Sequence, residues 1–208
     1  MERESETKLK LLRVAKEEFM EKGFHKASLR NICRKAGVTT GAMYFFFRDK
    51  ADLFGSLVRE PVAKIKTIVD DYFKGDIPPL YRGTDKPENL VVSMKILNTL
   101  YTYRDSFLLL LTKAEGSGYE KVKEDFTDQA DQHYREVVLE RKKNKEVSGE
   151  TVGLSRGEEA LCRWIARDQV DSFVYVLCNC ETMEEARECL PLLVTYLRGG
   201  WHTVMGGK

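Results

Sequence analysis

Apolar residues recur every three or four positions along most of this 208-residue chain, which is the spacing of one face of an α-helix. No stretch shows the two-residue alternation of a β-strand. The pattern predicts an all-α protein of about nine helices. We place them at residues 7–22, 28–36, 39–45, 49–74, 88–103, 105–114, 119–144, 155–178 and 182–204. Residues 1–6 are expected to be a disordered lead, and 75–87 and 145–155 to be loops, since they are polar or rich in Pro and Gly.

Local signals mark several helix ends. Gly23 is expected to end the first helix, and Pro61 predicts a kink or break near Glu60, because proline removes one backbone hydrogen bond. Two S/T-x-x-E sequences, which can form capping boxes, open the last two helices. They are Ser155 with Glu158 and Thr182 with Glu185.

Residues 28–50 have the order of a helix-turn-helix motif. Ser28 can cap a helix that Gly37 is suited to end, and Thr39 or Thr40 can cap a second one. The apolar face of the first helix is formed by Leu29, Ile32, Cys33 and Ala36. In the second helix, the side chains expected to point into the core are Met43, Tyr44 and Phe47, with Phe24 closing the core against Ile32 and Tyr44.

The exposed first turn of this second helix would then carry only small or hydroxylic side chains. They are Thr39, Thr40, Gly41 and Ala42. Side chains of this size allow a helix to approach base edges in the major groove of DNA. The pattern therefore favours a DNA-binding helix-turn-helix.

The first 57 or so residues resemble the DNA-binding domain of the tetracycline-repressor (TetR) family. The matching residues are Leu11-Leu12-Arg13-Val14-Ala15, Phe19, Gly23-Phe24, Ser28, Arg30, Ile32-Cys33, the run from Ala36 to Gly41, Met43-Tyr44, Phe47, Lys50 and Leu53. The resemblance implies an N-terminal three-helix DNA-binding domain (residues 1–57). A helical ligand-binding and dimerisation domain (58–208) would follow it. It also implies a homodimer on a near-palindromic double-stranded operator, most simply a repressor released by a small-molecule effector.

Carried over position by position, the resemblance also implies the DNA contacts. Base-proximal positions fall on Arg30, Thr39, Thr40, Gly41 and Ala42, and Arg30 is the candidate for a bidentate guanine contact. Tyr44 and Lys50 match positions that hold phosphate. Phe46 departs from the usual His or Tyr, so it is expected to pack against sugar or to turn inward.

Two further sets of candidates lie in the second domain. Inward-facing residues could line the implied effector pocket or simply form core: Met94, Leu97, Tyr101, Phe107, Phe126, His133, Trp164 and Phe173. The last two helices are apolar over faces wider than one small core requires, which predicts burial against a second copy. The interface candidates are Leu161, Ile165, Leu190, Leu193, Leu197 and Trp201.

Charge changes this picture little. The net charge is +1, but residues 1–60 carry 13 Lys and Arg against 9 Asp and Glu, whereas residues 61–208 carry 21 against 24. A basic first segment fits a nucleic-acid contact. The N-terminus lacks the apolar stretch of a secretory signal, and the longest apolar run, residues 107–111, is too short to span a bilayer. A cytoplasmic protein without membrane contact is expected.

One enzyme motif is present, but it lacks the structural context that it requires. Residues 153–157 match G-x-S-x-G, the nucleophile elbow of α/β hydrolases, but a polar segment precedes them where that fold needs a buried strand. No metal or cofactor site is predicted, because the five cysteines have no metal-ligand spacing. The alternative to effector control is a regulator governed by a protein partner or by oxidation of Cys178 and Cys180.

Overall fold

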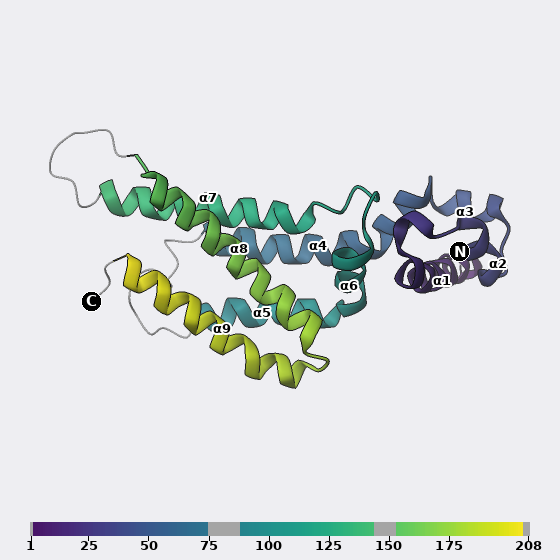
Figure 1. Ribbon diagram of the computed structural model, residues 1–208. Helices are drawn as coiled ribbons and strands as arrows, with labels where there is room; N and C mark the ends of the chain where they lie inside the picture. The colour runs from purple at the N-terminus through teal and green to yellow at the C-terminus, as the bar shows by residue number, and fades with distance from the viewer. Residues whose placement is uncertain (1, 75–87, 144–152, 206–208) are drawn as a thin grey trace. The chain divides into compact units, whose positions relative to one another are not determined.

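The computed structural model describes residues 2–74, 88–143 and 153–205, and over these ranges it contains nine helices and no strand (Figure 1). This confirms the all-α prediction. The helices are α1 (Glu2–Lys26), α2 (Leu29–Ala36), α3 (Thr40–Phe46), α4 (Lys50–Lys74), α5 (Glu88–Thr102), α6 (Arg104–Lys113), α7 (Val122–Lys143), α8 (Arg156–Asn179) and α9 (Met183–Val204). None of these helices is both long and apolar enough to cross a membrane. The loops predicted for residues 75–87 and 145–152 lie outside the described residues.

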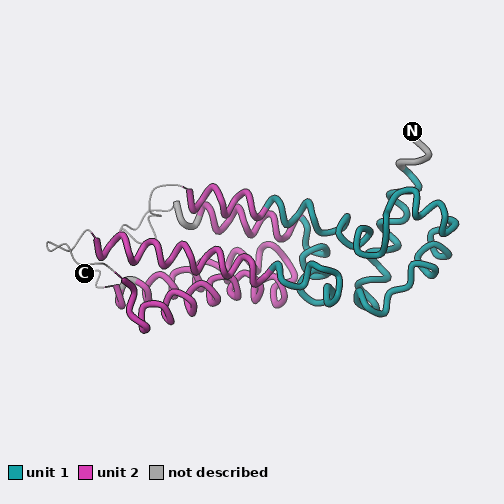
Figure 2. Tube along the Cα trace, turned by 90° about the horizontal axis from the view of Figure 1, so that it is seen from above, with its two compact units in different colours: residues 1–64, 103–122 teal, residues 65–102, 123–208 magenta. Residues whose placement is uncertain are grey.

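The chain divides into two compact units, which Figure 2 colours separately. The first comprises Met1–Lys64 and Tyr103–Val122, and the second comprises Ile65–Thr102 and Lys123–Lys208. These units differ from the predicted sequence domains because α6, far along the chain, packs against α1 within the first unit. Phe107 of α6, a candidate pocket residue, is therefore buried in the first unit and not in the second.

The core of the first unit is built from the predicted apolar faces. Leu11, Ala15 and Phe19 of α1 are buried, and the rings of Phe19 and Phe24 both pack edge-on against Phe54. Such an arrangement brings positive ring edges to negative ring faces. Burial of this apolar surface helps to hold α2 and α3, the two short helices of the motif, on α1.

Three local predictions need correction. The helix α1 begins at Glu2, where a disordered lead was expected. Of the kink or break expected near Glu60, the break is absent, because α4 continues through Pro61 from Lys50 to Lys74. Tyr44 does not point inward, because 53% of its surface is exposed, and Met43 and Phe47 alone provide the buried face of this segment.

The second unit holds two clusters of buried side chains. In one, Tyr134 of α7 packs against Trp201 of α9, with ring centroids 5.1 Å apart. In the other, residues of α5, α8 and α9 meet around Leu97, Val176 and Leu190. Both capping boxes are present, so Ser155 and Thr182 are helix caps. The serine of the G-x-S-x-G sequence thus has a structural role.

Candidate nucleic-acid interface

Two hydrogen bonds and one glycine conformation shape the α2–turn–α3 segment. The Ser28 hydroxyl accepts a hydrogen bond from the backbone N–H of Asn31 at 3.4 Å, and Thr39 likewise accepts from Ala42 at 3.1 Å. Gly37 ends α2 in the left-handed conformation (φ 67°), which a residue without Cβ adopts at little cost. The cap of α3 is therefore Thr39, the first of the two predicted threonines.

The first turn of α3 presents the predicted small surface to solvent. Thr39, Thr40 and Gly41 are exposed, and Ala42 is half-buried. Arg30 on α2 is also exposed. These five side chains remain the predicted base-proximal set, and the structure leaves them accessible for such contacts.

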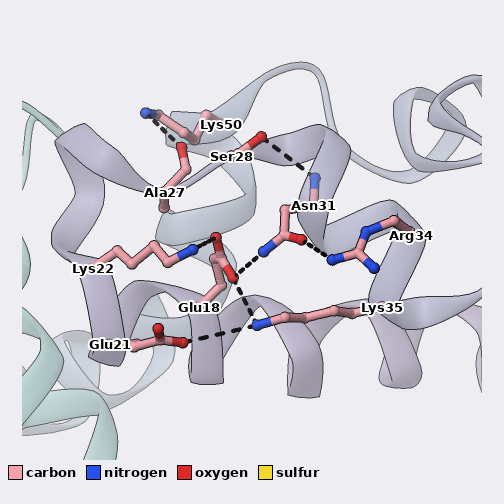
Figure 3. A network of polar contacts seen from close by, with 9 residues as sticks. All are labelled: Glu18, Glu21, Lys22, Ala27, Ser28, Asn31, Arg34, Lys35 and Lys50. Atoms are coloured by element: carbon pink, nitrogen blue, oxygen red, sulfur yellow. Dashed lines mark hydrogen bonds and ion pairs between the residues drawn. The ribbon is translucent and has the colours of Figure 1, made fainter.

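Lys50 is less free than the sequence suggested. Its Nζ donates to the carbonyl oxygens of His25 and Ala27, at 3.2 and 3.3 Å, and lies 4.6 Å from the centroid of the Phe24 ring. Figure 3 shows the contact with Ala27. An ammonium group has three N–H donors. A phosphate bound here would share the Lys50 ammonium group with the carbonyl oxygens of His25 and Ala27. Lys50 therefore also stabilises the fold.

Phe45 is an exposed aromatic residue that sequence reasoning missed. Its side chain is 73% exposed, whereas Phe46 is half-buried and Phe47 is buried. The rings of Phe45 and Phe46 meet edge-on at 5.1 Å. Three consecutive phenylalanines cannot all face one core. The run from Phe45 to Phe47 therefore already indicated that one of these rings would be exposed. Phe45 adds apolar surface beside Tyr44, of the kind that can contact a thymine methyl group or a sugar.

A buried carboxylate lies behind α2 and belongs to none of the predicted sets. Glu18 of α1 has no exposed surface. Its Oε2 accepts from the Nδ2 of Asn31 at 2.6 Å and from the Nζ of Lys35 at 2.9 Å, and the Nζ of Lys22 lies 3.3 Å from Oε1 (Figure 3). Burial alone would raise the pKa of Glu18, but these three partners lower it to about 2.

The candidate pocket residues of the second unit do not form one set. Met94, Leu97, Tyr101 and Phe173 belong to the cluster around Val176 and Leu190, whereas His133 and Phe126 lie on α7. The His133 ring is buried and stacks on Phe73 with centroids 4.3 Å apart, and burial lowers its pKa. Trp164 is 56% exposed on α8, so its assignment to an inward face is wrong.

The set of predicted interface residues also needs correction. Ile165, Leu190 and Trp201 are buried within the chain itself, so they hold this unit together and cannot present their side chains to a second copy. Leu161, Leu193 and Leu197 are half-buried. The large apolar side chains left exposed on α8 and α9 are Trp164, Tyr175, Leu192, Tyr196 and Val204.

The two cysteines proposed for oxidation differ in environment. Cys178 is exposed, whereas Cys180 is buried, and burial raises the pKa of its thiol. A protonated, shielded thiol is a poor nucleophile. Among the described residues, no group of three or more His, Cys, Asp and Glu side chains is placed to hold a metal ion.

The helix-turn-helix segment of this chain is similar to known proteins. The family described as "Bacterial regulatory proteins, tetR family" matches residues 11–57, which hold most of α1, all of α2 and α3, and the start of α4. The HTH-type transcriptional repressor BepR of Brucella suis is 43% identical over 54 residues, 26% of each chain. Over residues 11–57 the chain is similar to the tetR family.

The likeness beyond this tetR-family segment is one of fold. NalD of Pseudomonas aeruginosa, the secondary repressor of the MexAB-OprM multidrug efflux pump, aligns with a TM-score of 0.57 at 20% identity, over 93% of this chain and 96% of that one. A transcriptional regulator from Aquifex aeolicus VF5 aligns with a TM-score of 0.53 at 22% identity, over 95% and 99%. The curated relatives are matched over only 26% to 50% of their own lengths.

Proposed function

We propose that this protein is a homodimeric DNA-binding transcriptional regulator of the tetR family, a repressor that a small molecule releases from a near-palindromic operator. The observation that carries the proposal is the exposed first turn of α3. Its small side chains, Thr39 to Ala42, are accessible, as are Arg30 and Tyr44, on a helix-turn-helix with a buried core. A regulator of this kind would act on DNA in the cytoplasm.

The exposed apolar side chains of α8 and α9 support self-association. Trp164 and Tyr175 on α8, and Leu192 and Tyr196 on α9, are each more than half exposed. Large aromatic and aliphatic side chains in such numbers are typical of a surface that a partner covers. A two-fold pair would place two α3 helices in successive major grooves, about 34–36 Å apart.

DNA binding is tested by selection from a library of random duplexes. A dimer of this kind should enrich a near-palindromic sequence, and the enriched duplex then serves as the specific probe, with a scrambled duplex as reference. Arg30→Ala should weaken binding to the enriched duplex by about tenfold or more, because a bidentate guanine contact contributes roughly 1–3 kcal/mol of discrimination. Arg187→Ala, which removes an exposed arginine of α9, is the control. Failure to enrich any sequence would contradict the proposal.

Effector control has a separate test. A ligand that binds the second unit should raise the thermal midpoint and, at the same concentration, weaken operator binding, because it must favour the conformation that binds DNA less well. A coupling free energy of about 1–3 kcal/mol is typical. If ligands found by thermal shift leave the operator affinity unchanged, small-molecule release is the wrong mechanism and control by a partner protein becomes the better explanation.

A further inference from the structure

Glu18 contacts α2 at two points one helical turn apart. Asn31 and Lys35 are four residues apart on α2, so they lie on the same face, and both end on the same oxygen, Oε2 of Glu18. A single polar contact would fix only one point of α2. Two contacts along the helix axis restrict both the rotation of α2 and its sliding along α1.

The amide of Asn31 is itself held in one orientation. Arg34 donates to its Oδ1 at 2.7 Å, which leaves the Nδ2 donor to face Glu18 at 2.6 Å (Figure 3). Asn31 directly follows Arg30, and the turn after α2 leads into α3. The orientation of α2 therefore sets the direction of Arg30 and the starting point of α3.

The burial of the charged Glu18 side chain between two helices requires a physical explanation. An ionised carboxylate is costly to bury unless it is paired and hydrogen-bonded, and an apolar side chain would fill the space between two helices without that cost. An apolar contact, however, is not directional. The carboxylate supplies what an apolar residue cannot, because its hydrogen bonds favour one arrangement of the two helices.

Resting on the proposed DNA-binding function, we propose that Glu18 is a positioning residue for DNA recognition. Through Asn31 and Lys35 it holds α2 in the orientation at which Arg30 and the first turn of α3 meet the same stretch of DNA. It touches no DNA itself, since its side chain has no exposed surface.

The test uses two lysines that share the same carboxylate. Lys35→Met removes a contact between α1 and α2, whereas Lys22→Met removes an ion pair within α1. Each change removes one positive charge, and the two side chains are similarly exposed, at 37% for Lys35 and 40% for Lys22. Asn31→Ala removes the second inter-helix contact without a change of charge. Circular dichroism shows whether each variant is folded at the assay temperature.

We expect Asn31→Ala and Lys35→Met to weaken binding to the enriched duplex by about tenfold, because a hydrogen bond to a charged group is lost in each. Binding to the scrambled duplex should weaken far less, and Lys22→Met should bind the enriched duplex like the wild type. Wild-type affinity in both inter-helix variants would overturn the proposal. So would an equal loss in Lys22→Met, because the charge and not the link between helices would then matter.

A second readout does not depend on DNA. The backbone amides of α2 should exchange with solvent faster in Asn31→Ala and Lys35→Met than in Lys22→Met, because the helix is less firmly held. Equal exchange in all three variants would overturn the positioning role. If the wild type enriches no duplex, the proposed function fails, and hydrogen exchange still decides whether Glu18 positions α2.

Discussion

Replacing Glu18 by glutamine should destabilise the protein most near neutral pH and progressively less in acid. The partners Asn31, Lys35 and Lys22 favour the ionised carboxylate by more than burial disfavours it, so the pKa falls from 4.5 to about 2. Each pH unit of such a difference corresponds to about 1.4 kcal/mol, so the ionised form contributes about 3 kcal/mol to the free energy of unfolding.

The sign follows from the folded-state pKa lying below the unfolded one. The contribution of Glu18 is fully present above pH 4.5 and is lost as the pH falls toward about 2, because the carboxyl is then protonated in both states. Glutamine cannot ionise, so the variant lacks this contribution at every pH. The free energy of unfolding of the wild type should therefore exceed that of Glu18→Gln near neutral pH. This difference should narrow by about 3 kcal/mol as the pH falls from 4.5 toward about 2.

Urea unfolding, followed by circular dichroism at a series of pH values, measures this difference. Other carboxylates titrate in both proteins and cancel in the comparison. Glu17→Gln, which removes an exposed carboxylate from the same helix, is the control and should show no comparable loss. A difference between wild type and Glu18→Gln that stays constant with pH, or that widens in acid, would refute the assigned role of the ionised group.

Four other substitutions test separate parts of the fold. Trp201→Ala should lower the free energy of unfolding by about 3–5 kcal/mol in urea titrations, because a large buried side chain is removed. Trp164→Ala removes an exposed ring and should instead weaken self-association in sedimentation velocity, and an unchanged monomer–dimer equilibrium would count against the proposed interface. Ser155→Ala should lower the free energy of unfolding by about 1 kcal/mol, because α8 loses its N-cap, and thermal unfolding measures this loss. Gly37→Ala should lower the free energy of unfolding by about 1–2 kcal/mol in the same assay, because a left-handed backbone is unfavourable for a residue with Cβ. An unchanged free energy of unfolding would show that the turn relaxes.

The helix boundaries that follow from neighbouring residues were predictable. Ser28, Gly37, Ser155 and Thr182 each act as the sequence suggested, because a cap needs only a side chain and backbone groups a few residues away. The resemblance to the tetR family was also recognisable from the sequence, because the residues that carry it follow one another in order within residues 11–57.

Positions that depend on packing were not predictable in the same way. Trp164 and Trp201 both belong to the apolar patterns of their helices, yet one is exposed and the other is buried against Tyr134. Periodicity identifies a wide apolar face but not which part of it the rest of the chain covers. This is why three interface candidates proved to be core.

The helices and the helix-turn-helix were predictable from the sequence, because they depend on spacing and on contacts within a few residues. The resemblance of residues 11–57 to the tetR family was also visible there. The tertiary structure alone revealed that Tyr44 and Phe45 are exposed, that Lys50 binds the carbonyls at the end of α1, and that Glu18 is buried. The partners of Glu18 on α2 are 13 and 17 residues away. A buried charge is stable only when such distant groups converge on it, and their convergence is a property of the folded chain.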